Sequence, residues 1–277
     1  MWNRKEEESM FKEIFNVEMP VIGVVHLMPL PGAPLYDGTS VSIIAEKAVR
    51  EAKMMIDNGM DGLIVENFGD KMFQKRVGPE TTAALTVIAK EVKDATKAPV
   101  GLCVLQSDAI SGMAIAKAID ASFIRVPYYV ETSIVDAGMM DSIAAETLRY
   151  RRYLGCDAKI LADIHIKHSY PLAQRPIEYA AEDCYHRGLA DAVIITGRKT
   201  GGATNPDDLK RVHEALPEVP LIVGSGVTID NVEKYFDYIN GIIIASSLNV
   251  NGEVENHPDE KRICAFMDKV NAHRNMK

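Results

Sequence analysis

Several features that define common classes of protein are missing from this sequence. There are only four cysteines and no CxxC pair, which excludes a disulfide framework and favours buried, reduced thiols and a cytoplasmic location. No apolar run reaches the about 20 residues of a transmembrane helix. We therefore expect no transmembrane segment. The charged run Lys5-Glu6-Glu7-Glu8 stands where a secretion signal would need apolar residues. A net charge of -8 leaves no basic stripe, so we also expect no nucleic-acid partner.

What the sequence does contain is a regular alternation of short apolar segments and amphipathic helical patterns. The alternation begins after Pro20 and occurs eight times without a linker or a low-complexity segment. A hydrophobic content of 47% and a charged content of 25% are typical of a globular protein with a full core. The predicted strands are residues 21–27, 61–67, 99–105, 123–127, 159–165, 192–197, 220–225 and 241–247.

This alternation predicts the α/β class and a single (β/α)8 TIM barrel with a short N-terminal helix. A doubly wound open sheet is the alternative. We expect residues 1–19 to form an N-terminal helical extension and residues 20–277 to form the barrel domain. Met10, Phe11, Ile14 and Phe15 fit one face of the helix, which we expect to cover one end of the barrel. Contact with a partner or a membrane surface is the other use of that face.

The connecting segments indicate which end of the barrel carries the site. Helix-to-strand connections are short, whereas strand-to-helix connections are long and rich in polar residues. The site is therefore expected at the carboxyl ends of the strands. The Pro- and Gly-rich segments 28–39 and 198–206 are expected to act as mobile covers.

The segment 159–168 begins as an apolar strand and ends in ionisable residues. In an extended chain, Asp163, His165 and Lys167 share one face, and Leu161 lies on the same side. An internal polar network is the structural interpretation. The gathering of these groups at one strand end favours a catalytic role for Asp163, His165 and Lys167.

Other predicted strands also end in polar groups, which fits proton transfer or the binding of a divalent cation. Structural alternatives exist: Asp108 could cap a helix that begins near Ile110, and Arg125 could neutralise the acids of the barrel. The further catalytic candidates are His26, Glu66, Asp108 and Arg125.

We expect Glu66, Asp163 and His165 to meet across the barrel mouth and to share a proton, a water or a divalent cation. These three residues are the candidate metal ligands. Lys167 and Arg125 could balance the same charge without a metal, so no cofactor is assigned and a divalent metal ion is left open.

A glycine-rich loop follows the seventh predicted strand, at residues 223–228. Glycines allow backbone N–H groups to approach an anion closely, and a helix expected to open at residues 229–232 would add positive charge. The structural alternative is a tight turn that serves packing alone. The candidate substrate- and phosphate-binding residues are Asn67, Thr196, Gly197, Gly224, Ser225, Gly226, Val227, Ser246 and Ser247.

The chain resembles the BtpA/SgcQ family over residues 21–267. The resemblance is carried by six segments: GVVHL with PLPG at 23–32, DGLIVENFGD at 61–70, FIRV at 123–126, ADIHIKH at 162–168, RGLADA at 187–192 and GSGVT at 224–228. It implies a ribulose-phosphate-binding-type barrel. The family name comes from photosystem I biogenesis, whereas its fold relatives are enzymes of sugar-phosphate and indole pathways.

Two functions follow from these observations. The first is a cytoplasmic enzyme that acts on a small phosphorylated metabolite, a sugar phosphate or a nucleotide-like molecule, by isomerase, epimerase, lyase or hydrolase chemistry. The second is a non-catalytic assembly factor for a membrane complex such as photosystem I, with peripheral membrane contact. A scaffold has no need of ionisable groups inside a barrel mouth, so we favour the enzyme. We also expect a homo-oligomer.

Overall fold

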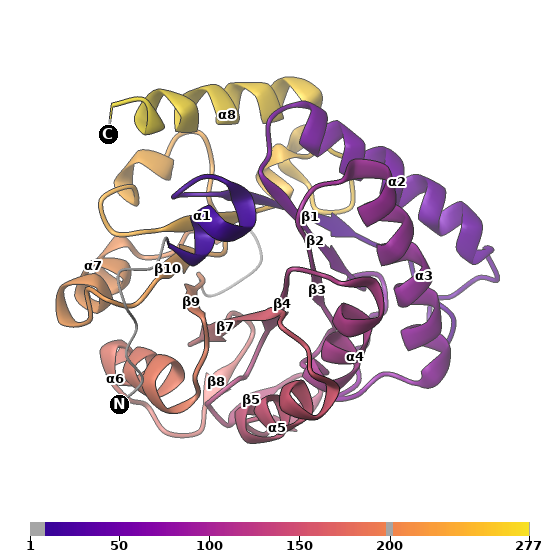
Figure 1. Ribbon diagram of the computed structural model, residues 1–277, viewed down its shortest axis with the longest axis horizontal. Helices are drawn as coiled ribbons and strands as arrows, with labels where there is room; N and C mark the ends of the chain where they lie inside the picture. The colour runs from indigo at the N-terminus through magenta and orange to yellow at the C-terminus, as the bar shows by residue number, and fades with distance from the viewer. Residues whose placement is uncertain (1–8, 198–201, 277) are drawn as a thin grey trace.

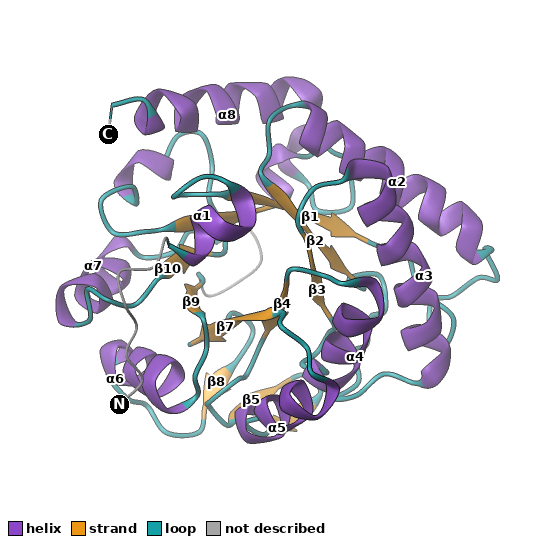
Figure 2. Ribbon diagram, viewed as in Figure 1, coloured by secondary structure: helices purple, strands orange, loops and turns teal. Residues whose placement is uncertain are grey.

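Eight parallel strands close into a barrel in the computed structural model, which describes residues 9–197 and 202–276 (Figure 1, Figure 2). Around the barrel the strands follow the order β1-β11-β10-β9-β7-β4-β3-β2. Each strand lies within a range predicted from the sequence, so the prediction of a TIM barrel is confirmed. The strands are β1 Val21–His26, β2 Gly62–Glu66, β3 Val100–Cys103, β4 Phe123–Val126, β7 Lys159–Ile164, β9 Ala192–Ile195, β10 Leu221–Val223 and β11 Gly241–Ile244.

Helices surround the barrel and cover the outer faces of its strands (Figure 2). Helix α2 shows why such segments are helical: Ser40 caps its first turn, and residues at helical spacing, including Ile44 and Ala48, are buried against the strands. The helices are α1 Met10–Phe15, α2 Val41–Asp57, α3 Pro79–Thr96, α4 Ala109–Ile119, α5 Ala144–Leu154, α6 Ile177–Glu182 with a π-helical turn at Asp183–Arg187, α7 Pro206–Ala215 and α8 Glu260–Arg274.

The segment after β10 departs from the pattern. The helix expected to open at residues 229–232 is absent, and only the 3-10 turn Val232–Lys234 follows. Asn231 explains the difference, because its side chain accepts a hydrogen bond from the amide of Thr228 and donates one to the carbonyl of Gly226. These bonds fold the segment back onto the preceding loop in competition with a helix. The 3-10 turns Ser246–Leu248 and Val250–Gly252 follow β11.

The barrel is filled by apolar side chains and closed at its amino-terminal end by α1. Phe11 and Phe15 belong to the same buried cluster as the inward-facing Ile64 and Leu161, and the Phe15 ring lies 5.7 Å from that of Phe123. The expectation that the N-terminal helix covers one end of the barrel is therefore confirmed for residues 10–15. In Figure 1, α1 lies across the barrel opening.

A small antiparallel sheet, which the sequence did not predict, lies in the loops that follow β4 and β7. It consists of β5 Ser133–Val135, β6 Gly138–Met140 and β8 Tyr170–Pro171, in the order β6-β5-β8. Because these loops leave the carboxyl ends of the barrel strands, the sheet belongs to the end of the barrel that carries the cavity described below.

Candidate functional site

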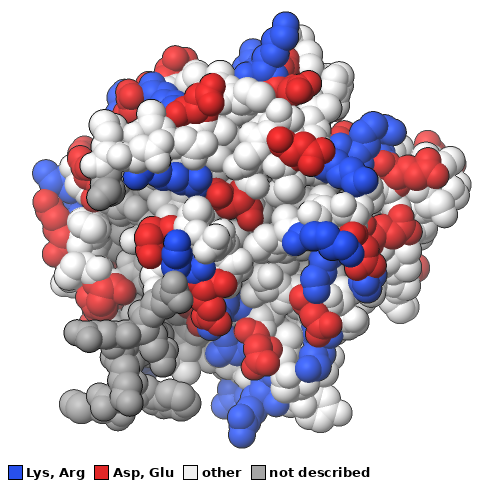
Figure 3. All heavy atoms as spheres, turned by 45° about the horizontal axis from the view of Figure 1, so that its top comes forward, with Lys and Arg blue, Asp and Glu red and all other residues white. Residues whose placement is uncertain are grey.

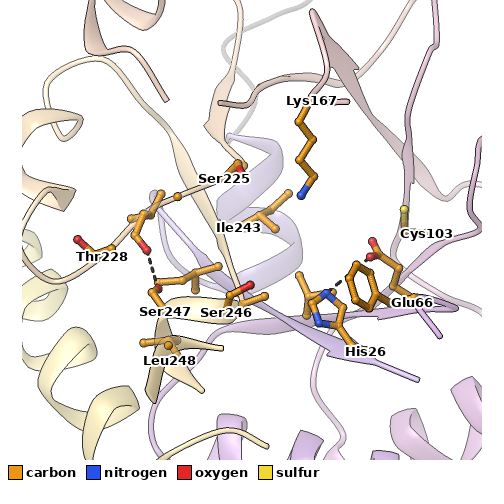
Figure 4. Close-up of a pocket in the computed structure, with 18 of the residues that line it drawn as sticks. His26, Glu66, Cys103, Lys167, Ser225, Thr228, Ile243, Ser246, Ser247 and Leu248 are labelled. Carbon is orange, nitrogen blue, oxygen red and sulfur yellow. Dashed lines mark hydrogen bonds and ion pairs between the residues drawn. The ribbon is translucent and has the colours of Figure 1, made fainter. Parts of the chain in front are cut away.

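A cavity of about 670 Å³ opens at the carboxyl ends of the barrel strands (Figure 4). Its volume is in the range of small-molecule binding sites. Val24, His26, Glu66 and Cys103 line it from β1, β2 and β3, and the segments that follow β10 and β11 line the opposite side. The predicted working end of the barrel thus contains a cavity lined by ionisable side chains.

His26 and Glu66 form one polar pair in this cavity. They end the neighbouring strands β1 and β2, where they are register partners, and His26 Nε2 lies 3.6 Å from Glu66 Oε1. The imidazole also stacks on Phe68, with ring centroids 4.3 Å apart. Burial lowers the pKa of His26 to about 4, although Glu66 acts in the opposite direction. His26 is therefore neutral at neutral pH, and its ring offers one donor and one acceptor nitrogen to a bound molecule.

Cys103 also faces this cavity. Burial raises the pKa of its thiol well above the ordinary value, and the negative charge of Glu66 raises it further. The thiol therefore stays protonated, which makes Cys103 a poor nucleophile in this environment.

Arg125 and Asp163 form a second, deeply buried pair. Nε and Nη2 of Arg125 each donate a hydrogen bond of 2.9 Å to an oxygen of Asp163. Burial acts to lower the pKa of Arg125, but Asp163 more than offsets this effect and the net pKa is raised. Arg125 lines the cavity, whereas Asp163 is not among the lining residues. The bidentate geometry leaves the Asp163 carboxylate engaged by a permanent cation.

Lys167 extends into the cavity between Ser225 and the His26–Glu66 pair (Figure 4). Its backbone amide donates a hydrogen bond of 3.1 Å to Thr196 Oγ1, which fixes the start of the side chain. Burial, and then the nearby charge of Arg125, lowers the pKa of the Lys167 ammonium.

His165 does not join these groups. Strand β7 ends at Ile164, and the left-handed backbone of His165, with φ of 45°, interrupts the alternation of faces that an extended segment would have kept. The His165 amide donates to Glu131 Oε2 over 3.0 Å, and its Nε2 lies 3.4 Å from Glu131 Oε1. Burial would raise the pKa of Glu131, but the hydrogen bonds from His165 outweigh it and lower the pKa.

The expectation that Glu66, Asp163 and His165 meet across the mouth is therefore wrong. Each has a different partner: His26, Arg125 and Glu131 respectively. Within residues 9–197 and 202–276, no group of three or more His, Cys, Asp or Glu side chains is arranged to hold a metal ion. These three residues consequently do not form the shared divalent-cation site that the sequence suggested.

The glycine-rich loop after β10 lines the cavity through Gly224, Ser225, Gly226 and Val227. The Gly224 amide donates to the carbonyl of Ile195 over 2.9 Å. The next three amides donate to no acceptor in the part of the chain that the structure describes. The Ser225 hydroxyl is likewise buried without a partner among the described residues. Such donors can bind an anion without losing a bond to the protein.

Packing explains why this loop contains glycine. A Cβ atom on Gly224 would lie 2.4 Å from Cγ2 of Ile194. Gly226 has φ of +62°, and a Cβ there would lie 2.1 Å from the carbonyl oxygen of Gly202. Ser246 also lines the cavity, and the Ser247 hydroxyl donates to the carbonyl of Val227 over 2.6 Å.

Residues 17–272 match the model of the BtpA family. The chain belongs to the BtpA family. It is similar to the photosystem I biogenesis protein BtpA of Synechocystis sp., at 40% identity over 93% of this chain and 90% of that one. It is also similar to the putative sgc region protein SgcQ of Escherichia coli, at 29% identity over 95% of this chain and 98% of that one.

Solved structures show that this BtpA-family fold is a TIM barrel. Thiamine phosphate pyrophosphorylase from Pyrococcus furiosus aligns with a TM-score of 0.58 and 12% identity, over 92% of this chain and 96% of that one. Orotidine 5'-phosphate decarboxylase from Pyrococcus horikoshii aligns with a TM-score of 0.56 and 13% identity, over 91% and 99%. At these identities the likeness establishes the fold alone.

Several residues that the sequence suggested for the BtpA-family site make structural contacts and are not among the residues that line the cavity. Asn67 Oδ1 accepts from the amide of Leu105, and its Nδ2 donates to Asp70. Asp108 caps α4 by accepting a hydrogen bond from the amide of Ser111, which is the structural role that the sequence offered as an alternative to catalysis. Thr196 accepts from Lys167, and Gly197 packs against Gly202.

Sequence reasoning missed the aromatic wall of the cavity, formed by Phe68, Phe73 and Tyr128. Phe68 and Tyr128 immediately follow predicted strands, and this place at the carboxyl end of a strand could have identified them as cavity residues. It also missed Glu131, because this residue lies in the loop before the unpredicted sheet. The charged rim residues Lys261 and Arg262, at the start of α8, carried no recognisable motif.

Of the two loops expected to act as covers, the structure describes segment 28–39 in full and segment 198–206 in part. In the loop after β1, Leu30 is fully buried and its amide donates to Asp70 Oδ1 over 2.8 Å, which anchors the middle of segment 28–39. Residues 198–201 of the other loop lie outside the described residues. A covering movement stays a prediction for both loops.

In the part of the chain that the structure describes, none of the helices combines the length and the apolar character needed to cross a bilayer.

Proposed function

We propose that this BtpA-family protein is an enzyme that acts on a small phosphorylated metabolite by isomerase, epimerase, lyase or hydrolase chemistry. One observation carries the proposal. The cavity is lined on one side by a loop whose amides at Ser225 to Val227 bond no acceptor among the described residues, and on the other by the His26–Glu66 pair and Lys167. A phosphate on the first side would leave the rest of the molecule facing proton-transfer groups on the second.

The roles follow from these surroundings. The amides of Ser225, Gly226 and Val227, the Ser225 hydroxyl and Ser246 bind the phosphate. Glu66 and His26 transfer protons. Arg125 contributes positive charge to the cavity and is held in place by Asp163. Because no long helix begins beside the loop, phosphate binding rests on these hydrogen-bond donors and not on a helix dipole.

Other features are consistent with this function. The solved structures that share the fold include proteins named for reactions of thiamine phosphate and orotidine 5'-phosphate. The four cysteines are free thiols, which suits the cytoplasm. A homo-oligomer remains part of the proposal.

Titration calorimetry with inorganic phosphate and with ribose 5-phosphate tests this function. We expect both to bind, ribose 5-phosphate more tightly, because it fills more of the cavity. Ser225→Ala removes a buried hydroxyl donor to a charged ligand, so we expect Kd for phosphate to rise about tenfold.

Ser40→Ala provides the control, because Ser40 caps α2 on the outside of the barrel and should leave Kd for phosphate unchanged. Absence of binding by both ligands, or equal effects of the two substitutions on Kd, would contradict the proposed phosphate site.

A second function is favoured by one comparison: the 40% identical relative in Synechocystis sp. is named for photosystem I biogenesis. An assembly factor of this kind would recognise a membrane complex with its surface. The two functions are distinguished by whether phosphate binding depends on Ser225, since a scaffold makes no use of donors inside the cavity.

A further inference from the structure

Lys167 is a charged residue that lines the cavity and has no ionic partner among the described residues. Within the described residues, no carboxylate lies within salt-bridge distance of its ammonium group, whereas Arg125 is paired with Asp163. The Lys167 side chain is half-buried, and charges that are partly removed from water are usually paired. An unpaired ammonium that faces a cavity therefore calls for a role in that cavity.

The base of the Lys167 side chain is firmly positioned. Its amide is held by Thr196, and the preceding Ile166 is buried in a small cluster with Tyr128 and Met140. The four methylene groups then carry the amine into the cavity, between Ser225 and Glu66 (Figure 4). A positioned side chain loses little freedom when it reacts with a bound molecule.

Burial, and then the charge of Arg125, raises the fraction of Lys167 that is uncharged. Asp163 and Glu66 act to raise its pKa, but Asp163 is already bonded by both donors of Arg125 and Glu66 lies beside His26. Burial and the charge of Arg125 outweigh them, so the net pKa is lowered. For each unit by which the pKa falls, the neutral fraction at neutral pH rises about tenfold. A desolvated amine beside another cation is an activated nucleophile.

We propose that Lys167 forms an imine with a carbonyl group of the phosphorylated substrate. This inference rests on the proposed function and narrows the substrate to an aldehyde or ketone that also carries a phosphate. The phosphate would occupy the loop at Ser225 to Val227, on one side of Lys167, and the carbon skeleton would extend towards Glu66 and His26 on the other.

The reaction balances without a cofactor. The neutral amine adds to the carbonyl carbon, and the carbonyl oxygen takes up the proton that the nitrogen releases, which gives a carbinolamine. A second proton converts the hydroxyl into water, which leaves as the carbon–nitrogen double bond forms. Glu66 and His26 are the groups of the cavity that can carry these protons. The protonated imine then withdraws electrons from the adjacent carbon, which assists isomerisation or carbon–carbon cleavage.

Reductive trapping tests the imine. The full-length protein is incubated separately with dihydroxyacetone phosphate, ribose 5-phosphate and pyridoxal 5'-phosphate, each with sodium cyanoborohydride, and the labelled lysines are identified by peptide mass spectrometry. With at least one probe, we expect about tenfold more label on Lys167 than on any other lysine. Inorganic phosphate should suppress this label.

Variants separate reaction from binding. Lys167→Arg keeps the positive charge but cannot form an imine, so we expect loss of the label with retention of phosphate binding. Lys71→Arg is the matched control, because Lys71 lies over the Phe68 ring at 4.7 Å, near the mouth, and pairs with Glu255. This variant should be labelled at Lys167 as the unmodified protein is.

The outcomes distinguish the two proposals. If phosphate binds in calorimetry but no probe labels Lys167 above the other lysines, the imine is wrong and the phosphate-dependent function stands. If neither phosphate binding nor labelling is found, both proposals fail. The imine is also overturned if the Lys167→Arg variant takes up as much label as the unmodified protein, at other lysines, and phosphate does not reduce that label.

Discussion

At the scale of single residues, the Arg125–Asp163 pair shows how a structural role can resemble a catalytic one. From the sequence, Asp163 is one of several ionisable groups at a strand end and is a candidate for catalysis. In the structure its side chain is completely buried and bonded twice to Arg125. Removing the carboxylate would leave the arginine charge buried without a partner.

We therefore expect Asp163→Ala to lower the free energy of unfolding by about 3 kcal/mol, measured by urea denaturation. The double substitution Arg125→Met with Asp163→Leu, which removes both charges and retains apolar volume, should cost less than the single one. A single variant as stable as the unmodified protein would contradict the structural role of the pair.

His26 provides a prediction about pH. Its pKa falls from an ordinary value of 6.5 in the unfolded chain to about 4 in the folded protein. Between these values the unfolded chain binds the additional proton, so this contribution to stability is complete above pH 6.5 and is lost as the pH falls towards 4. The loss should reach about 2 kcal/mol at pH 5.

Urea denaturation of the His26→Gln variant between pH 7 and pH 4 measures this contribution. Glutamine cannot take up the proton, so the variant should show a shallower loss of unfolding free energy than the unmodified protein over this interval. His257→Gln replaces an exposed histidine and should retain the steeper dependence. Parallel pH profiles for the unmodified protein and His26→Gln would show that His26 is not held in its neutral form.

At the scale of elements, the sequence predicted what periodicity controls and missed what single backbone angles and side-chain bonds control. All eight barrel strands were located because each is a short apolar segment between helical patterns. The turn at His165 depends on one positive φ, and the missing helix after β10 depends on two bonds of Asn231. Neither leaves a periodic signal. Strands β5, β6 and β8 are too short to produce one.

The same distinction applies to the candidate site. His26, Glu66, Arg125 and Lys167 were identified because residues at the carboxyl ends of barrel strands face the cavity. Their partners could not be deduced, because pairing between neighbouring strands depends on the register of the strands and on how far each side chain reaches. Asp163 and His165 therefore carried the same signal in sequence but have different partners in space.

Helix α1 supports a prediction at this scale. Phe15 is buried against the backbone of Gly62, where an added Cβ would lie 2.5 Å from the ring, and it contacts Phe123. Phe15→Ala should therefore lower the free energy of unfolding by about 4 kcal/mol through loss of burial and formation of a cavity. Glu13→Ala, on the exposed side of the same helix, should change it by less than about 1 kcal/mol. Equal effects in urea denaturation would show that α1 does not close the barrel.

At the scale of the whole molecule, the two ends of the barrel have different uses. The amino-terminal end is filled by Phe11 and Phe15, and the carboxyl end holds the cavity. The apolar face of α1, which the sequence left available for a membrane or a partner, is therefore occupied inside the protein. An assembly factor could therefore not use the apolar face of α1 to contact its partner, which weakens the case for that function.

Surface charge leads to a prediction that separates the two functions. The net charge is -8, and on the face shown in Figure 3 Lys and Arg side chains are interspersed with Asp and Glu. Electrostatic binding to an anionic membrane needs clustered positive charge, at about 1 kcal/mol for each basic residue near the surface. We therefore expect the protein to stay in the supernatant when phosphatidylglycerol vesicles are sedimented at physiological salt. The same chain with an added polylysine tail should sediment with them, which controls for vesicle recovery. Sedimentation of the unmodified protein with vesicles, weakened by added salt, would instead favour a function at a membrane surface.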